Sequence, residues 1–383
     1  MKLRIVPNDT LFFRDGKPFS MGDETWADGI FPPNPSTVYG SIRTKFITEN
    51  GGLSKFLKDK MKNKIGTKFE VPENGFQIKA IFLGFSEETS AITDRYYFPA
   101  PLDIACLKDN ADYILPLKPL PKAEIKTSCP LPQIISAESI LEEIELPPKA
   151  FIHETAFYDR YFEGHFSNIR LTRIEDILLQ EPKVGIGRDN YTRTSEEAML
   201  YRVGMNRLKP EWSIYVEISG LERHDLISND GDTTLIKLGG EGKTASTSIV
   251  DFNEEAKKPE ELEYLKNSIR ENKQFKIYFM TPAIFNNGWY PDFIGQNFFM
   301  NDFPQIEMIA AAVGKPDHIG GWDMGNNEPK PMRRAIAAGS VFFFNIHDTN
   351  KLNIEQIIQQ FHRQNFGYNT AEGFGHCLMT IWR

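Results

Sequence analysis

A glycine-rich run that ends in lysine and threonine is the first feature of this sequence that could do chemistry. It reads Gly239-Gly240-Glu241-Gly242-Lys243-Thr244 and resembles the end of a phosphate-binding loop. A nucleotide-hydrolysing loop of the Walker A type needs another glycine five positions before its Gly-Lys-Thr end, and a helix directly after it. Lys237 occupies that position and the following residues predict a strand, so we do not expect NTP hydrolysis.

Two interpretations of this run remain open. Glycine accepts the left-handed backbone conformation that tight turns need, so the run can be a purely structural turn. Alternatively, successive backbone N–H groups can cradle RNA phosphates while a lysine adds positive charge. The candidate RNA-binding residues of this run are Gly239, Gly240, Glu241, Gly242 and Lys243.

A second run, Gly373-Phe374-Gly375-His376, also stands just ahead of a predicted strand and has the same two interpretations. Phe374 could stack on a base, but an aromatic residue within a glycine turn often fills the adjacent core, and we favour the core. General acid–base cleavage of RNA would need a histidine aligned with a second polar group, and His376 is the best candidate for it. The other candidates are His153, His165 and His318.

The stretch from Gly185 to Leu208 interleaves cations with an aromatic residue. Its members are Arg188, Tyr191, Arg193, Arg202 and Arg207. Single-stranded RNA binding uses guanidinium groups for phosphates and flat side chains for splayed bases. We therefore predict a β-hairpin arm that contacts RNA, with its tip near Thr194 to Ala198.

A predicted helix begins after Asn34, a potential N-cap, with Pro35 in its first position, and ends at Asn50-Gly51-Gly52. Ser36 and Thr37 lie near its free N-terminus, and Arg43 follows two turns later, which is a geometry that suits a phosphodiester. An ordinary amphipathic helix with a solvated Arg43 is an equally good interpretation.

Metal and disulfide chemistry find no support in the sequence. No histidine pair or carboxylate cluster stands at metal-ligand spacing, and Cys106, Cys129 and Cys377 are far apart. We expect no cofactor and no metal. Trp289 and Trp322 stand beside glycines and could stack on bases, although a core or interface role is more common for tryptophan.

The elements that must position these residues alternate between strands and helices. After the opening strand around Leu3 and Ile5, strands are predicted at Phe76 to Phe85, Arg95 to Phe98, Trp212 to Ser219 and Thr244 to Phe252. A proline-rich, irregular stretch between them predicts an insertion packed on the surface, over residues 117–180. A charged helical connector is predicted at residues 256–274.

The remaining residues predict a complete small domain of β-α-β-β-α-β order. Its elements are a strand at Phe275 to Met280, a helix at Pro304 to Val313, strands at His318 to Trp322 and Ala335 to Ile346, a helix at Ile354 to Arg363 and a last strand at His376 to Trp382. The predicted fold is α+β, with two ferredoxin-like (RRM-like) domains, long insertions and a β-hairpin arm. The domains are 1–255, with insertion 117–180 and arm 185–208, and 275–383.

Composition sets limits on the function. The 383 residues are 40% hydrophobic and can bury a sizeable core, while the net charge of −8 argues against indiscriminate coating of nucleic acid. A local basic groove is still compatible with that charge. No apolar run reaches the roughly 18 to 20 residues of a membrane span, and we expect a soluble, cytoplasmic protein without membrane contacts.

Several segments together resemble the third subunit of the Cmr complex of type III-B CRISPR systems, in the repeat-associated mysterious protein (RAMP) superfamily. The segments are Asp9 to Phe19, Phe31 to Gly40 with Arg43, Gly185 to Arg188, Thr192 to Thr194, Leu200 to Arg202, Leu238 to Lys243, Thr281 to Ala283, Gly288-Trp289, Gly320 to Asp323, Ala338 to Val341 and Gly373 to Gly375. The resemblance fades between Leu117 and Gln180. It adds Arg14 to the RNA-binding candidates.

This resemblance implies a non-catalytic subunit that binds the 5′ repeat-derived tag of the crRNA. Its implied partners are the large polymerase-like subunit and the first backbone RAMP subunit, with target RNA as an indirect partner. Two alternatives stay open: a CRISPR RNA-processing endonuclease of the same superfamily, and a purely structural bridging subunit that binds no RNA.

Overall fold

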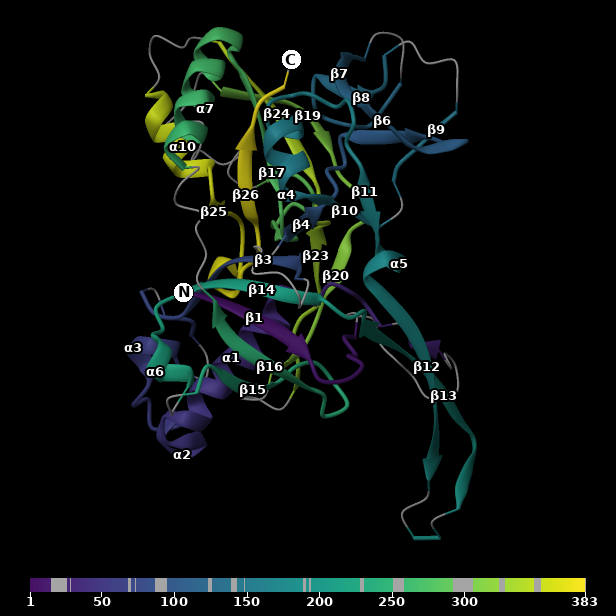
Figure 1. Cartoon of the computed structure of the whole chain (residues 1–383), viewed down its shortest axis with the longest axis vertical. Helices are drawn as coiled ribbons and strands as arrows, with labels where there is room; N and C mark the ends of the chain where they lie inside the picture. Colours follow the sequence, from purple (N-terminus) through teal and green to yellow (C-terminus); the bar gives the residue numbers. More distant parts are fainter. Residues whose placement is uncertain are drawn as a thin grey trace.

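The computed structural model in Figure 1 has a mixed α/β architecture with mostly antiparallel sheets. It describes residues 1–14, 26–27, 29–67, 70–72, 74–86, 95–122, 126–138, 143–147, 149–188, 191–192, 194–227, 231–250, 258–291, 306–323, 328–347 and 353–382.

The larger sheet has eight strands in the order β11-β10-β4-β3-β14-β1-β16-β15, and every neighbouring pair is antiparallel. These strands are β1 (Lys2–Pro7), β3 (Gln77–Phe85), β4 (Arg95–Pro99), β10 (Ala150–His153), β11 (Leu171–Arg173), β14 (Trp212–Ser219), β15 (Thr233–Lys237) and β16 (Thr244–Val250). The helices near it are α1 (Pro35–Glu49), α2 (Gly52–Phe56), α3 (Lys62–Ile65) and α6 (Arg223–Leu226).

Side-chain alternation along β3 explains how this sheet is covered on both faces. Ile81 and Leu83 belong to the core cluster that contains α1, while Ala80 and Phe82 belong to the cluster that contains the second sheet. Successive side chains of a strand point to opposite faces, so one strand serves two cores. Helix α1 contributes Val38, Ile42 and Phe46 to the first of these cores.

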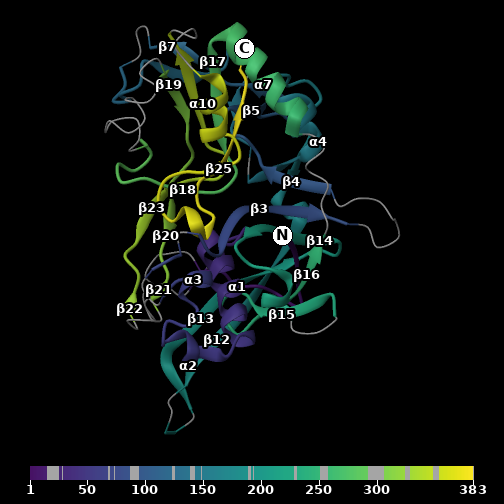
Figure 2. The same ribbon diagram turned by 90° about the vertical axis from the view of Figure 1, so that its left-hand side faces the viewer.

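The second sheet has five strands in the order β19-β24-β17-β26-β25. Its strands are β17 (Gln274–Phe279), β19 (Ile306–Ala312), β24 (Val341–Ile346), β25 (Gln364–Asn365) and β26 (His376–Thr380). Helices α7 (Lys258–Asn272) and α10 (Ile354–Phe361) contact each other beside this sheet, and Figure 2 shows them together at the end that holds the C-terminus.

A buried polar group joins the second sheet to the segment that follows β4 and to the π-helix Phe157–Tyr161. Lys276 on β17 lies 2.6 Å from the Asp103 carboxylate, and both side chains are 1% exposed. The hydroxyl of Tyr161 donates to the other carboxylate oxygen over 2.8 Å, and the Lys276 ammonium lies 3.9 Å from the centre of the Tyr161 ring. Burial lowers the pKa of Lys276, with Asp103 opposing that effect. The two sheets share one hydrophobic core, which contains Phe82 of β3 and Phe275 of β17.

The arm is a long two-stranded hairpin of β12 (Leu178–Arg188) and β13 (Ser195–Leu208), and β2 (Trp26–Ala27) pairs with β13. Figures 1 and 2 show the arm extending from the body at the end opposite the C-terminus.

Smaller elements complete the chain. They are β5 (Ile104–Leu107), β6 (Asn110–Pro116), β7 (Lys118–Pro121), β8 (Gln133–Ser136), β9 (Ile144–Glu145), α4 (Glu154–Ala156), the π-helix Phe157–Tyr161, α5 (Ile174–Ile177), β18 (Ala283–Ile284), β20 (Asp317–Ile319), β21 (Trp322–Asp323), β22 (Glu328–Pro329), β23 (Arg333–Ile336) and the 3₁₀ turn Thr370–Glu372.

Several sequence predictions are confirmed. Helices α1, α7 and α10 form where they were expected, and strand β14 has the predicted bounds. The predicted helix at Pro304 to Val313 is wrong, because residues 306–312 form strand β19, an edge of the second sheet. The predicted strand at Ala335 to Ile346 is two strands, β23 and β24. The arm tip also differs, because Ser195 to Ala198 already belong to β13, whereas Tyr191 and Thr192 are turn residues.

The stretch 117–180 is more than a surface insertion. It supplies strands β10 and β11 to the larger sheet, and Phe157 and Tyr161 are fully buried in the core shared by the two sheets. Its prolines indicated irregular structure, but the short apolar segment Phe151-Ile152 has enough buried surface to hold a strand against β4.

Candidate nucleic-acid interface

The first glycine loop lies directly before β16 and bends over the segment that follows β1. Gly239 has a φ of 82°, and a Cβ there would lie 2.5 Å from the carbonyl oxygen of Phe12. The N–H of Gly240 donates to that same oxygen over 2.9 Å. Gly242 also has positive φ, at 66°, but nothing lies within 4 Å of its Cβ position. Close approach to the chain therefore requires Gly239, whereas Gly242 faces open space.

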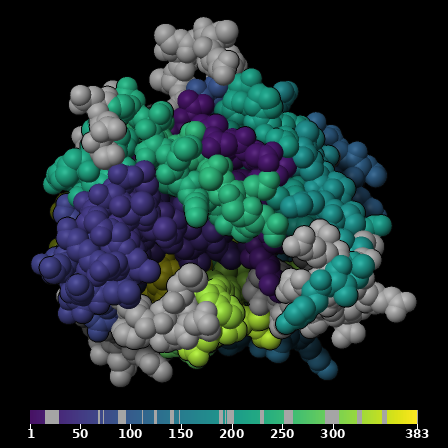
Figure 3. Space-filling view, turned by 90° about the horizontal axis from the view of Figure 1, so that it is seen from below, coloured from purple at the N-terminus to yellow at the C-terminus, as the bar shows by residue number. Residues whose placement is uncertain are grey.

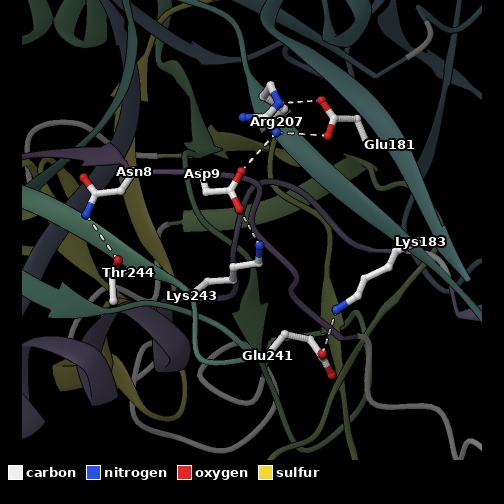
Figure 4. A network of polar contacts seen from close by, with 8 residues as sticks. All are labelled: Asn8, Asp9, Glu181, Lys183, Arg207, Glu241, Lys243 and Thr244. Carbon is white, nitrogen blue, oxygen red and sulfur yellow. Dashed lines mark hydrogen bonds and ion pairs between the residues drawn. The ribbon is translucent and has the colours of Figure 1, made fainter. Parts of the chain in front are cut away.

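An ion-pair network connects this loop to the base of the arm (Figure 4). The Lys243 ammonium lies 2.7 Å from one oxygen of Asp9, and the Arg207 guanidinium lies 3.0 Å from the other. Arg207 also donates to both oxygens of Glu181, and Lys183 lies 3.3 Å from Glu241. These contacts lower the pKa of Asp9, chiefly through the hydrogen bond from Lys243. The arm and the glycine loop therefore form one polar surface.

The arm presents some of the predicted RNA contacts to solvent. Tyr191, in the turn, is 97% exposed, and Arg202 on β13 is exposed opposite Val184. Arg188 ends β12 and pairs with Ser195, while Arg193 lies outside the described residues. Arg14 is exposed and bridges to Gly29 beside the same hairpin.

The residues of helix α1 that were predicted to contact RNA are less exposed than those of the arm. Ser36 and Thr37 are half-buried in the first turn, and the Asn34 side chain makes no capping hydrogen bond. The Arg43 guanidinium donates to the carbonyl oxygens of Ile65 and Thr67 and lies over the Phe56 ring at 5.0 Å. Burial lowers its pKa. Arg43 therefore anchors the chain around α3, and neither the phosphate-binding nor the solvated interpretation describes it.

The second glycine loop packs tightly against neighbouring backbone, which leaves no space for a ligand at Gly375. Gly373 and Gly375 have φ values of 98° and 73°, and a Cβ on Gly375 would lie 1.8 Å from the carbonyl oxygen of Phe366. Phe374 is completely buried in a cluster with Ile284, Ile319 and Ala335. Phe374 is therefore a core residue, as favoured above, and its inclusion among RNA-stacking candidates is wrong.

His376 is buried beside this loop. Its Nδ1 lies 2.8 Å from the Asn365 side-chain oxygen, and its backbone N–H donates to the Thr281 hydroxyl over 2.8 Å. Burial lowers the pKa of His376 to about 3, so the imidazole is neutral at physiological pH. It lines a cleft of about 430 Å³ together with Lys79 and Arg363. Trp289 is packed partly against the shared core, whereas Trp322 is 52% exposed.

Several segments that carry the family resemblance meet around a second cavity of about 800 Å³. Residues 32–35 line it together with Thr281-Pro282 and Ala338, which lie more than about 200 positions further along the sequence. Its walls also include residues of β3, β4 and β10, so the larger sheet forms its floor.

Sequence reasoning missed Asp9 and Glu181, which hold Lys243 and Arg207 in place. Asp9 begins a segment that carries the family resemblance and lies two residues after β1, whereas Glu181 was marked only by its position two residues before Lys183. The described residues contain no group of three potential metal ligands, and none of the described helices is long and apolar enough to cross a membrane.

Comparison with known proteins places these observations in a family. The model of the family described as "CRISPR-associated protein (Cas_Cmr3)" matches residues 3–382. The chain is 22% identical over 377 residues to the CRISPR system CMR subunit Cmr3 of Saccharolobus solfataricus, covering 96% of this chain and 95% of that protein.

Solved structures that are similar include a chain of the Type III-B Cmr-beta complex bound to cognate target RNA and AMPPnP, with 17% identity, a TM-score of 0.47 and coverage of 94% of this chain and 88% of that one. A chain of a Csm3-Csm4 subcomplex of the type III-A interference complex is 12% identical, with a TM-score of 0.35 and coverage of 91% and 94%. From the match over residues 3–382, the chain belongs to the Cas_Cmr3 family of CRISPR-associated proteins.

Proposed function

We propose that this subunit binds the 5′ repeat-derived tag of the crRNA and connects the large polymerase-like subunit to the first backbone subunit, without catalytic chemistry of its own. The observation that carries the proposal is the polar surface in which the arm base and the Gly239–Lys243 loop are held together through Asp9. The arm that begins at this surface projects from the body and carries the exposed side chains of Arg202 and Tyr191, where a strand of RNA can reach them. Target RNA would then be an indirect partner, in a cytoplasmic complex.

We also infer that the two halves are each built on a ferredoxin-like (RRM-like) unit. Across the larger sheet, four antiparallel strands run β3-β14-β1-β16, which are the second, third, first and fourth of these strands in chain order. Strands β17, β19, β24 and β26 have the same order in the second sheet. Each glycine loop directly precedes the fourth strand of its half, which supports an internal duplication.

The endonuclease alternative depends most on His376. A general acid or base works best when its pKa is near the operating pH. Burial holds the pKa of His376 near 3, and its Nδ1 is engaged by Asn365. This histidine is therefore poorly suited to proton transfer at neutral pH, and the binding function is favoured.

The test measures the affinity of the assembled complex for tag RNA at several salt concentrations. Each of Arg188→Ala, Arg193→Ala and Arg202→Ala should weaken binding about tenfold or more, because a hydrogen bond to a charged group contributes roughly 1.5 to 3 kcal/mol. The salt dependence should become shallower by about 0.7 in logarithmic slope per lost phosphate contact.

The matched control is Arg170→Ala, which removes an exposed arginine outside the arm, just before β11. It should leave both affinity and salt slope unchanged. If the triple arm variant assembles and binds tag RNA like the wild type, the arm is no RNA contact, and the purely structural bridging subunit becomes the better explanation.

A further inference from the structure

The α2–α3 segment carries a second basic surface, which the RNA-binding proposal does not use. Residues 50–65 contain five lysines against a single acid, Asp59, in a chain of net charge −8. Lys58, Lys60 and Lys62 are exposed and form no ion pair within the described part of the chain. The neighbouring acids are already engaged, since Glu49 pairs with Lys45 and Asp225 with Lys64.

Two leucines accompany these lysines. Leu53 and Leu57 are 62% and 57% exposed and lie one helical turn apart, as the N–H of Leu57 donates to the carbonyl oxygen of Leu53. Packing of this segment against the body does not use these two leucines, because three other apolar side chains of the segment are buried there. They are Phe56, Met61 and Ile65, all at most 7% exposed.

The surface is also held in a fixed shape. Arg43 donates to the carbonyl oxygens of Ile65 and Thr67 and lies over the Phe56 ring. The N–H of Asp59 donates to the carbonyl oxygen of Phe56, and that of Lys62 to Asp59, which closes the turn between the two helices. Such a preorganised surface loses little conformational entropy when a partner binds.

Its position separates it from the arm. In Figure 1, α2 and α3 lie on one side of the body and β12–β13 on the other, and Figure 3 shows the blue-violet residues of this segment across the lower face from the teal arm. One short RNA segment bound along the arm would therefore not pass over these lysines.

We propose that the surface formed by Leu53, Leu57, Lys58, Lys60 and Lys62 docks an acidic surface of a partner protein in the complex. Its charge requires carboxylates opposite the lysines, and its leucines require an apolar side chain between them. RNA fits less well, because this segment offers no arginine and no exposed aromatic side chain for bases. The inference rests on the proposed bridging role and names the chemistry of one partner.

Zero-length carbodiimide coupling tests this contact in the assembled complex. The reagent activates a carboxylate, and attack by a lysine amine forms an amide with release of the urea. Amides between Lys58, Lys60 or Lys62 and an Asp or Glu of another subunit are expected. The triple Lys→Arg variant at these positions should assemble normally but lose the amides, because guanidinium groups are unreactive under these conditions.

Substitutions measure the energetic contribution. Lys58→Glu with Lys62→Glu, and separately Leu53→Ala with Leu57→Ala, should each weaken binding of the chain to the remaining subunits at least about tenfold. The matched controls are Leu235→Ala, at a leucine that is 60% exposed on β15, and Lys126→Glu in an exposed loop. Neither control should change assembly, and all variants should unfold at the wild-type temperature.

Three results would overturn the proposal. Amides within pairs of identical chains would assign the surface to self-association, and photochemical cross-links from this segment to RNA would assign it to nucleic acid. Unchanged assembly of both double variants, with amine labelling equal in the free chain and in the complex, would show that nothing docks there. A loss of tag binding by the arm variants leaves these readouts unaffected, so the two proposals fail independently.

Discussion

The two glycine loops each lie directly before a strand, β16 in the larger sheet and β26 in the second sheet, yet their environments are opposite. Gly239–Gly242 is exposed and joined to its surroundings by ion pairs, whereas Gly373–Gly375 wraps a fully buried phenylalanine and a neutral histidine. A glycine run therefore identifies where the backbone needs unusual conformations, and the neighbouring side chains decide whether a ligand can reach it. Four predictions test this difference.

The largest effect is expected for Phe374→Ala. Removing this fully buried ring should lower the free energy of unfolding by about 3 to 5 kcal/mol, through lost burial and the cavity left behind. Chemical denaturation of the isolated chain measures it. Affinity for tag RNA, counted per folded complex, should not change, and a selective loss of RNA binding would show instead that the ring reaches a base.

The next largest difference in stability is expected between glycine-to-alanine substitutions in the two loops. Gly375→Ala puts a Cβ against the Phe366 carbonyl oxygen at positive φ, and should cost about 3 kcal/mol of stability. Gly242→Ala meets no neighbouring atom, so only its φ penalty of about 1 kcal/mol remains. Equal losses at the two sites, from parallel unfolding curves, would contradict the described difference.

Acid should destabilise the second loop first. Burial lowers the pKa of His376 to about 3 in the folded chain, below the ordinary histidine pKa of about 6.5, so the unfolded chain takes up a proton more readily. The neutral, buried His376 therefore contributes to the free energy of unfolding fully above pH 6.5. This contribution is lost as the pH falls, by about 2 kcal/mol between pH 7 and 5. Comparing the free energy of unfolding against pH for wild type and His376→Asn separates the histidine contribution from that of the carboxylates. Parallel curves of unfolding free energy against pH for the two proteins would show that His376 makes no such contribution.

The smallest change in stability is expected at the first loop. Lys243→Ala breaks an ion pair with an exposed carboxylate, and such pairs contribute little to folding. Its unfolding midpoint should match the wild type within error, while binding of tag RNA by the complex weakens and its salt dependence becomes shallower. Lys108→Ala, which breaks an exposed ion pair with Glu143, is the control that should leave RNA binding intact.

Local sequence patterns predicted the elements with a strong hydrophobic periodicity or clear start and stop residues. The predictions failed where contacts with segments distant in the sequence determine the secondary structure. Helix α10 buries Ile354, Ile357, Ile358 and Phe361 at helical spacing, and its position was predicted correctly. Residues 306–312, Ile-Glu-Met-Ile-Ala-Ala-Ala, have high helix propensity, but pairing with β24 makes them a strand. Tertiary context overrides intrinsic preference there.

The candidate site shows the same limit. The arginines and the glycine run were visible in the sequence, but their mutual placement depends on Asp9, which is 234 positions from Lys243. Arg43 was misjudged because its partners are main-chain carbonyl groups, which no residue type reveals.

The buried pair of Asp103 and Lys276 has a consequence for the protein as it leaves the ribosome. The two residues are 173 positions apart, which at about 5 to 20 residues per second corresponds to a delay of roughly 10 to 35 s. During that interval the nascent chain holds Asp103 and the Tyr161 hydroxyl without the cation that neutralises them in the finished core. The core around Asp103 therefore closes only after strand β17 has been translated, whereas the separate core between the larger sheet and α1 does not depend on β17.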